Sequence, residues 1–73
     1  MENQHRKIQS YRELTQEEID TMNRIKAMER DCLYLLEQIG ELPEVDQRRL
    51  AIAKTNIEQA AMWATKAVAR PEQ

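Results

Sequence analysis

The sequence predicts an all-α protein whose two main helices form an antiparallel hairpin, and three observations carry this prediction. The 73 residues contain only one glycine and two prolines, and helix-favouring residues such as Glu, Lys, Arg, Gln and Ala are abundant. Apolar residues recur at spacings of three and four along two long stretches, as they do on one face of a helix. A short connection around Pro43 separates the two stretches, and a connection of this length places consecutive helices side by side in opposite directions.

The first predicted helix runs from a capping residue at Thr15 to about Ile39. Thr15 and Glu18 have the spacing of a capping box, in which each side chain accepts a hydrogen bond from the backbone N–H of the other residue. Gly40 is expected to end this helix in the left-handed conformation that glycine adopts at many helix ends. The apolar positions of the helix form one stripe that comprises Ile19, Met22, Ile25, Met28, Cys32, Leu35, Leu36 and Ile39.

The second predicted helix follows an N-cap at Asp46 and continues to about Ala69, before Pro71. The residues expected to pack on the first helix are Leu50, Ala53, Ile57, Ala60, Ala64 and Ala67. Other apolar residues lie off this line, and a helix that is apolar on more than one side must be buried on more than one side. One antiparallel partner cannot cover them. We therefore expect the C-terminal helices of several subunits to pack together, with Met62 and Trp63 at the interface.

The small size of the chain also indicates an oligomer. A domain of this length buries only about 60% of the surface that its unfolded chain exposes. Small scaffolds are therefore usually reinforced by disulfides, a metal ion or partner subunits. The single Cys32 cannot close a disulfide within the chain, and no Cys/His cluster offers metal ligands. Association into a homo-oligomer is the remaining way to stabilise the fold.

The composition argues against several classes of function. No apolar run approaches the ~20 residues that cross a membrane, and the polar residues 1–12 do not resemble a signal peptide, so we expect a cytoplasmic protein. The net charge of −2 and the pI near 5.4 disfavour binding to DNA or RNA, although a small anionic ligand needs only a few local cations. No Ser–His or Cys–His arrangement, glycine-rich phosphate loop or H-E-x-x-H pair is present, so neither an enzyme nor a cofactor is expected.

Two residues around the first helix are candidates for ligand binding. Tyr11 stands just before the Thr15 cap, and Lys26 lies one helical step beyond Met22. A tyrosine can stack on a base and a lysine can hold a phosphate. Each also has a plainer explanation, as part of a frayed terminus or as a lysine that extends its charge into water. Lys26 lies about 16 Å along the helix from Thr15. The two candidates meet only if the arm at residues 1–13 folds back or if they come from different subunits.

Two long runs of the sequence resemble a known family. The runs YRELTQEEIDTMNRIKA and DQRRLAIAKTNIEQAAMWATKAVARPE are similar to the small phage anti-CBASS proteins that act as sponges for cyclic oligonucleotides. CBASS is a bacterial defence in which infection triggers synthesis of a cyclic nucleotide signal. The most recognisable segments are Tyr11 to Ile19, Ile25–Lys26, Leu50 to Thr55 and Ala67 to Pro71.

The resemblance implies a compact helical homohexamer without catalytic activity, which acts in the cytoplasm of the infected bacterial host. Such proteins bind cyclic dinucleotides, notably cyclic GMP-AMP, in pockets between paired subunits. Some also bind cyclic trinucleotides at separate sites between subunits. In the family, the tyrosine that matches Tyr11 stacks on a base, and the lysine that matches Lys26 contacts the phosphates. For the trinucleotide site, Lys66 is the best candidate for a phosphate contact, with Thr65 and Arg70 behind it.

Two departures from the family pattern disfavour the trinucleotide site. Many relatives carry Gly-Phe-Met where this chain has Ala60-Ala61-Met62, and they carry an arginine where it has Lys66. Without the glycine, a Cβ atom is present at this position, and a ligand cannot come as close to the backbone. A lysine also cannot form the two parallel hydrogen bonds to a phosphate that an arginine forms.

The sequence thus predicts a sponge that sequesters a cyclic dinucleotide signal and so protects a phage from the defence of its host. Two alternatives stay open. One is a helical-hairpin oligomer that serves as a protein-interaction module without a nucleotide site, and such a module has no need for both Tyr11 and Lys26. The other is a small DNA-binding regulator, against which the acidic pI and the lack of a basic recognition helix argue.

Overall fold

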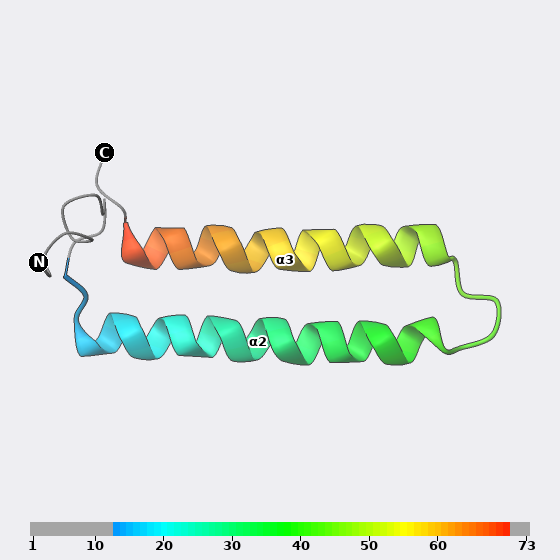
Figure 1. The fold of residues 1–73 in the computed structure, drawn as a ribbon, viewed down its shortest axis with the longest axis horizontal. Coiled ribbons are helices and arrows are strands. Elements are labelled where there is room, and N and C mark those ends of the chain that lie inside the picture. The colour runs from blue at the N-terminus through cyan, green and yellow to red at the C-terminus, as the bar shows by residue number, and fades with distance from the viewer. Residues whose placement is uncertain (1–12, 71–73) are drawn as a thin grey trace, which may run out of the picture.

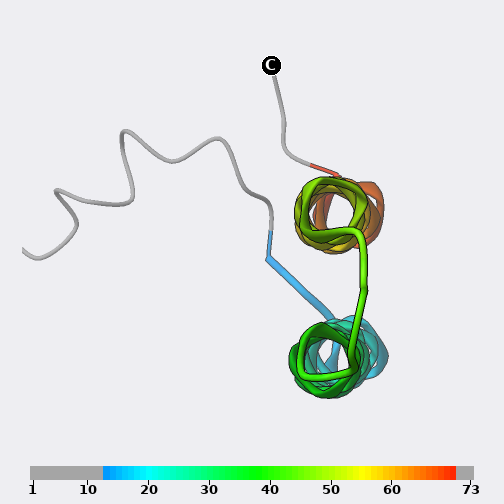
Figure 2. The same ribbon diagram turned by 90° about the vertical axis from the view of Figure 1, so that its right-hand side faces the viewer.

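The computed structural model describes residues 13–70, which form two long helices joined by a short turn (Figure 1). Helix α2 spans Gln16–Gly40 and helix α3 spans Gln47–Ala69. Figure 2 views the hairpin nearly end-on, so that each helix is seen along its axis and the two lie side by side. Figure 1 shows that the chain follows them in opposite directions. The predicted all-α class and the antiparallel hairpin are therefore confirmed. No helix within the described residues is long and apolar enough to span a membrane.

The start of α2 is fixed by the capping box that the sequence predicts. The backbone N–H of Glu18 donates to Oγ1 of Thr15 (3.1 Å), and the backbone N–H of Thr15 donates to Oε1 of Glu18 (2.9 Å). The second oxygen of the Glu18 carboxylate accepts a hydrogen bond from the Arg70 guanidinium at 3.4 Å. One carboxylate thereby connects the beginning of α2 with the end of α3, although the exposed Arg70 side chain limits the strength of this ion pair.

The end of α2 differs from the prediction for Gly40. The only glycine does not have a positive φ, and the residue that caps the helix, Glu41, is also right-handed (φ −91°, ψ −5°). Gly40 instead permits close packing of the helices, because a Cβ atom at this position would lie 3.1 Å from Cδ2 of Leu50. The left-handed residues of the described chain are Glu44 (φ 63°) and Arg70 (φ 48°).

Asp46 caps the start of α3, as predicted. Its carboxylate accepts a hydrogen bond from the backbone N–H of Arg49 (3.0 Å) and also pairs with the Arg49 guanidinium. These two hydrogen bonds, the backbone one first, hold the pKa of Asp46 below its usual value. The amide of Gln47 donates to the carbonyl of Gly40 at 3.3 Å and links the two ends of the turn.

The face that α3 presents to α2 is not the one predicted for its C-terminal half. Ala60 and Ala67, which the sequence places on that face, are exposed, whereas Ala61 is buried. The observed line takes two successive steps of four residues around Ile57, and so follows the 3.6-residue repeat of a straight helix. The predicted line alternated steps of three and four, as in a supercoiled pair. The packing positions of α3 are Leu50, Ala53, Ile57, Ala61, Ala64 and Val68.

Fewer apolar residues of α2 pack against α3 than the sequence predicted. Three members of the predicted stripe, Ile19, Met28 and Leu35, are exposed (39%, 41% and 54%). Cys32 is half-buried on the line, and its thiol contacts Sδ of Met28 at 3.7 Å. The half-buried packing positions of α2 are Glu18, Met22, Ile25, Glu29, Cys32, Leu36 and Ile39, so two carboxylates lie on the face toward α3.

We predict that Thr15→Ala lowers the free energy of unfolding by about 1 kcal/mol, because the N–H of Glu18 loses its acceptor. Urea denaturation at a fixed protein concentration measures the change. Thr55→Ala is the matched control, since Thr55 is exposed in the middle of α3 and alanine is the better helix former there. Equal destabilisation by both substitutions would show that the capping box does not hold the helix start.

We predict that Asp46→Asn lowers stability at neutral pH and flattens its decline in acid. Because the pKa of Asp46 is lowered by folding, its ionised form stabilises the protein above the ordinary pKa, and that stabilisation is lost as the pH falls through the folded pKa. Asparagine is still a good N-cap, so the helix start is kept. Urea midpoints between about pH 7 and pH 2 measure the effect. An unchanged pH profile would contradict the role of this carboxylate.

Candidate functional site

Of the two residues predicted to bind a cyclic dinucleotide, one lies within the described part of the chain. Tyr11 lies outside the described residues. Lys26 lies in the third turn of α2, directly after the packing position Ile25, and its side chain is exposed. No ion pair or hydrogen bond involves the ammonium of Lys26 within residues 13–70, so this cation remains available to a ligand.

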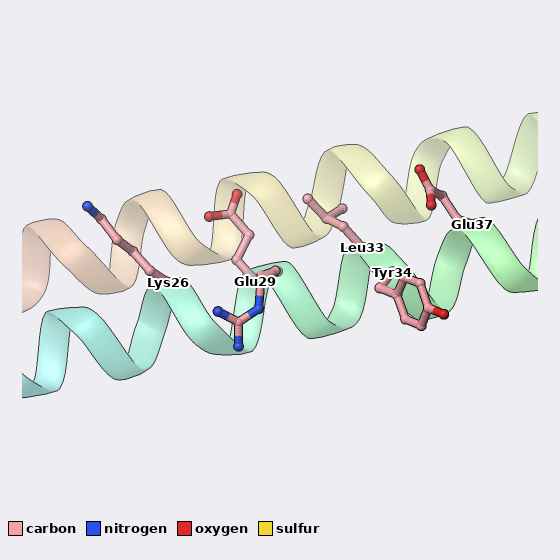
Figure 3. Close-up of a pocket in the computed structure, with 6 residues that line it drawn as sticks. Lys26, Glu29, Leu33, Tyr34 and Glu37 are labelled. Atoms are coloured by element: carbon pink, nitrogen blue, oxygen red, sulfur yellow. The ribbon is translucent and has the colours of Figure 1, made fainter.

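Lys26 stands at one end of a shallow hollow on the surface of α2 (Figure 3). In this view Lys26, Glu29 and Glu37 extend in the direction of α3, whereas Tyr34 extends to the opposite side of its helix. The hollow is therefore a trough between two rows of side chains that rise from one helix. Its lining residues are Lys26, Glu29, Arg30, Leu33, Tyr34 and Glu37.

Arg30 and Tyr34 are functional candidates that the sequence analysis missed. Together with Lys26 they form a row of residues four apart, so they follow one another along the surface of α2. The phenol of Tyr34 is 63% exposed. Arg30 pairs with Asp31 at 3.3 Å, but both side chains are more than 70% exposed, and such a pair holds the guanidinium weakly. The regular spacing of a lysine, an arginine and a tyrosine was the signal that could have found them.

The charges that line the hollow limit what one chain can bind. Lys26 and Arg30 supply two positive charges, and Glu29 and Glu37 supply two negative charges. Glu29 follows Lys26 by three residues and lines the same hollow, so its carboxylate lowers the positive potential there. A doubly negative ligand is thus poorly neutralised by a single chain.

A second hollow continues from the first toward the turn. It is lined by both helices, and it shares Leu33 and Glu37 with the hollow beside Lys26. Its floor is apolar, and Glu37 and Lys54 are its charged residues. The two hollows lie on one side of the hairpin, which we call the hollow flank. The second hollow is lined by Leu33, Leu36, Glu37, Gly40, Gln47, Leu50, Ala51 and Lys54.

The three residues expected at a trinucleotide site lie near the end of α3 and differ in exposure. Lys66 is exposed, and its ammonium lies 5.6 Å from the centroid of the Trp63 ring, a distance that fits a cation–π contact. Arg70 is exposed and pairs with Glu18, whereas Thr65 is half-buried. None of the three lines either hollow.

The side chains of residues 13–70 do not form a group of three or more His, Cys, Asp or Glu placed to hold a metal ion. The hollow beside Lys26 instead offers an ammonium, a guanidinium, a phenol and two carboxylates. These groups bind anions, aromatic rings and hydrogen-bond donors.

Comparison with known proteins identifies the family. Residues 4–69, which include both helices and also Tyr11, match the family model described as the Acb2/Tad1 hairpin domain. The chain belongs to the Acb2/Tad1 hairpin family. Its sequence is also 38% identical to anti-CBASS protein 2 of Pseudomonas phage JBD67, in a match that covers 99% of this chain and 98% of that protein. The resemblance to the phage anti-CBASS family is therefore confirmed.

Most candidate residues of this Acb2/Tad1 hairpin, but not all, fall within the range that the family model matches. Tyr11, Lys26 and Lys66 all fall within the matched range, whereas Arg70 lies one residue beyond its end. The hollow flank and the row from Lys26 to Tyr34 also belong entirely to the matched hairpin.

Proposed function

We propose that this chain is a phage-encoded, non-catalytic sponge that binds a cyclic dinucleotide signal and thereby inhibits CBASS immunity. The observation that carries the proposal is the similarity to anti-CBASS protein 2, which extends over nearly the full length of both chains. A sponge acts by mass action, so it must be abundant and must bind its ligand tightly enough to hold the free signal below the threshold of its effector. Its place of action is the cytoplasm of the infected bacterium, where the signal is made.

In the proposed site, Lys26 contacts the phosphates and Tyr11 stacks on a base. The exposed ammonium at the end of the hollow supports the first contact, because an ammonium is a good point-charge partner for phosphate. Stacking on an aromatic ring contributes about 1–3 kcal/mol per base. Neither contact needs a reaction to occur, so binding alone removes the signal from its effector.

The proposed ligand pocket lies between subunits of a homo-oligomer, as a hexamer of the family type would provide. The carboxylates of Glu29 and Glu37 offset the two cations of the hollow within one chain. Pairing two subunits brings a second Lys26 and a second Tyr11 to the same ligand. The two bases and two phosphates of a cyclic dinucleotide then each have a partner.

We propose a weaker second site for cyclic trinucleotides around Lys66, with Thr65 and Arg70. The Lys66 ammonium beside the Trp63 ring supports the presence of a cation on this exposed surface. The Arg70 guanidinium must leave the Glu18 carboxylate before it can bind a phosphate, and that exchange lowers the affinity.

The alternative is a protein-interaction module that acts on a host protein without binding a nucleotide. Large exposed side chains, such as Leu35 (54%) and Trp63 (60%), favour this alternative because apolar surface of this kind marks interaction sites. The two functions differ in their response to cyclic nucleotides, which only the sponge binds.

We predict that Lys26→Ala and Tyr11→Ala each abolish binding of cyclic GMP-AMP and leave the oligomer intact. Isothermal titration measures binding, and thermal melting reports it independently. A ligand at 100 times its Kd stabilises the native state by about 2.7 kcal/mol, so only the parent protein should melt at a higher temperature with ligand. Lys54→Ala is the matched control, because it removes an exposed lysine from the other hollow of the same flank.

Two outcomes contradict different parts of this account. Normal binding by both variants would show that the site is elsewhere, even if the chain is a sponge. Failure of a panel of cyclic di- and trinucleotides to bind the parent protein, or to raise its melting temperature, would favour the interaction module.

A further inference from the structure

Three residues of α2 follow one another at intervals of four along the hollow that begins at Lys26. They are Lys26, Arg30 and Tyr34, and all three line this hollow. Side chains four residues apart on a helix are neighbours, with about 5–6 Å between their Cβ atoms. The row therefore presents an ammonium, a guanidinium and an aromatic ring in order, each one helical turn from the next.

The guanidinium of Arg30 is only partly engaged within the hairpin. Its Nε atom pairs with Oδ1 of the neighbouring Asp31 at 3.3 Å, and within residues 13–70 no hydrogen bond or ion pair involves its two terminal amino groups. Both side chains are more than 70% exposed, so water screens the pair. The free amino groups of an arginine form a planar fork that binds two oxygens of one phosphate.

The ring of Tyr34 is a large aromatic surface that the hairpin does not cover. It is 63% exposed. Every nucleic-acid base has a flat face that can stack on such a ring, whatever the identity of the base. The end of the row away from Lys26 is therefore suited to a base, as its other two members are suited to a phosphate.

We infer that Arg30 and Tyr34 form a nucleotide subsite next to Lys26, in which Arg30 binds a phosphate and Tyr34 stacks on the base of the same nucleotide. The inference rests on the proposed sponge function and extends it, because it assigns two further residues to the ligand. One ribose separates the phosphate of a nucleotide from its base, and one helical turn separates Arg30 from Tyr34. The two parts of the ligand and the two side chains thus have matching separations.

Lys26 and Arg30 act on the same phosphate in this subsite. A phosphodiester has one negative charge and two non-bridging oxygens, so an ammonium and a guanidinium on adjacent turns can hold it together. Lys26 supplies a point charge without a preferred direction, whereas the fork of Arg30 fixes the orientation of the phosphate. That orientation directs the ribose and the base along α2 toward Tyr34.

The carboxylates of the hollow favour the same direction. Glu29 and Glu37 extend toward α3, whereas Tyr34 extends to the opposite side of its helix (Figure 3). Each step of four residues turns the row by about 40° around α2, so the row moves away from α3 between Lys26 and Tyr34. A nucleotide that follows the row thereby moves to the side of the helix opposite to the one toward which both carboxylates extend.

One subsite of this kind binds half of a cyclic dinucleotide. The ligand has two phosphates and two bases, and a second hairpin offers the same row to its other half. The two cations of one hollow are offset by two carboxylates, so a single half-site binds weakly and tight binding needs both. A base has two faces, and stacking on Tyr34 is therefore compatible with the contact proposed for Tyr11.

Substitution of Arg30 tests the phosphate contact. Arg30→Gln should weaken binding of cyclic GMP-AMP at least ~10-fold in isothermal titration, the loss expected for a hydrogen bond to a charged group. Arg30→Lys should recover only part of the affinity, because a lysine keeps the charge and lacks the fork. Arg24→Gln is the matched control and should bind as the parent does, since Arg24 is an exposed arginine of α2 that lines neither hollow. Full affinity in Arg30→Lys would overturn the oriented contact.

Substitution of Tyr34 tests the stacking contact. Tyr34→Leu should weaken binding about 5- to 150-fold, the range for the loss of one stacked base. Tyr34→Phe keeps the ring and should bind as the parent does, and weak binding by this variant would overturn stacking in favour of a hydrogen bond from the phenol. The ring is exposed, so sedimentation should show an unchanged assembly. A smaller assembly would overturn the inference, because Tyr34 would then belong to a contact between subunits.

The parent protein distinguishes failure of this inference from failure of the proposed function. If the parent binds cyclic GMP-AMP and both Arg30→Gln and Tyr34→Leu bind it equally well, the subsite is overturned and the sponge stands. If the parent binds no cyclic nucleotide, the sponge is overturned together with the subsite.

Discussion

The structure depends on one constraint, which is that two amphipathic helices of this length have almost no core when they pair alone. The inner faces of α2 and α3 contribute small or polar residues at key positions, such as Glu18, Glu29 and Ala61, and only two alanines are buried among the described residues. Several large apolar side chains, including Leu35 and Trp63, are exposed outside these inner faces. The chain thus folds into a hairpin that leaves several large apolar side chains exposed.

The same constraint gives the two sides of the hairpin different chemistry. The hollow flank combines cations, carboxylates and an apolar floor, which suits a small polar ligand with flat bases. The large apolar side chains that lie outside the hollows, such as Met28, Leu35 and Trp63, are exposed in the single hairpin. In the proposed sponge, one assembly of subunits would both form the ligand pocket and cover these exposed side chains.

The helices, their caps and their antiparallel pairing were predictable from the sequence, and the detailed contacts between the helices were not. The capping roles of Thr15 and Asp46 could be predicted from the few residues that follow each of them, because a cap involves only the first helical turn. The role of Gly40 was predicted wrongly, since it depends on Leu50 of the other helix. The packing line of α3 was wrong after Ile57, because supercoiled and straight helix pairs have repeats that differ by only a tenth of a residue.

The candidate site was predictable only in part. Lys26 was found because of its place beside the apolar stripe and its match to the family, and its exposure at the end of a hollow was not visible from the sequence. Arg30 and Tyr34 belong to no motif, so their four-residue spacing from Lys26 gained meaning only once the structure showed that all three line one hollow. The role of Tyr11 stays a prediction, since that residue lies outside the described part of the chain.

Native mass spectrometry with cyclic GMP-AMP tests the central claim most directly, because it separates species by subunit count and by bound ligand at once. The account predicts that assembled species carry the nucleotide and that any monomer present at the same time carries none. A well-folded monomer that binds the nucleotide as tightly as the assembly does would contradict it.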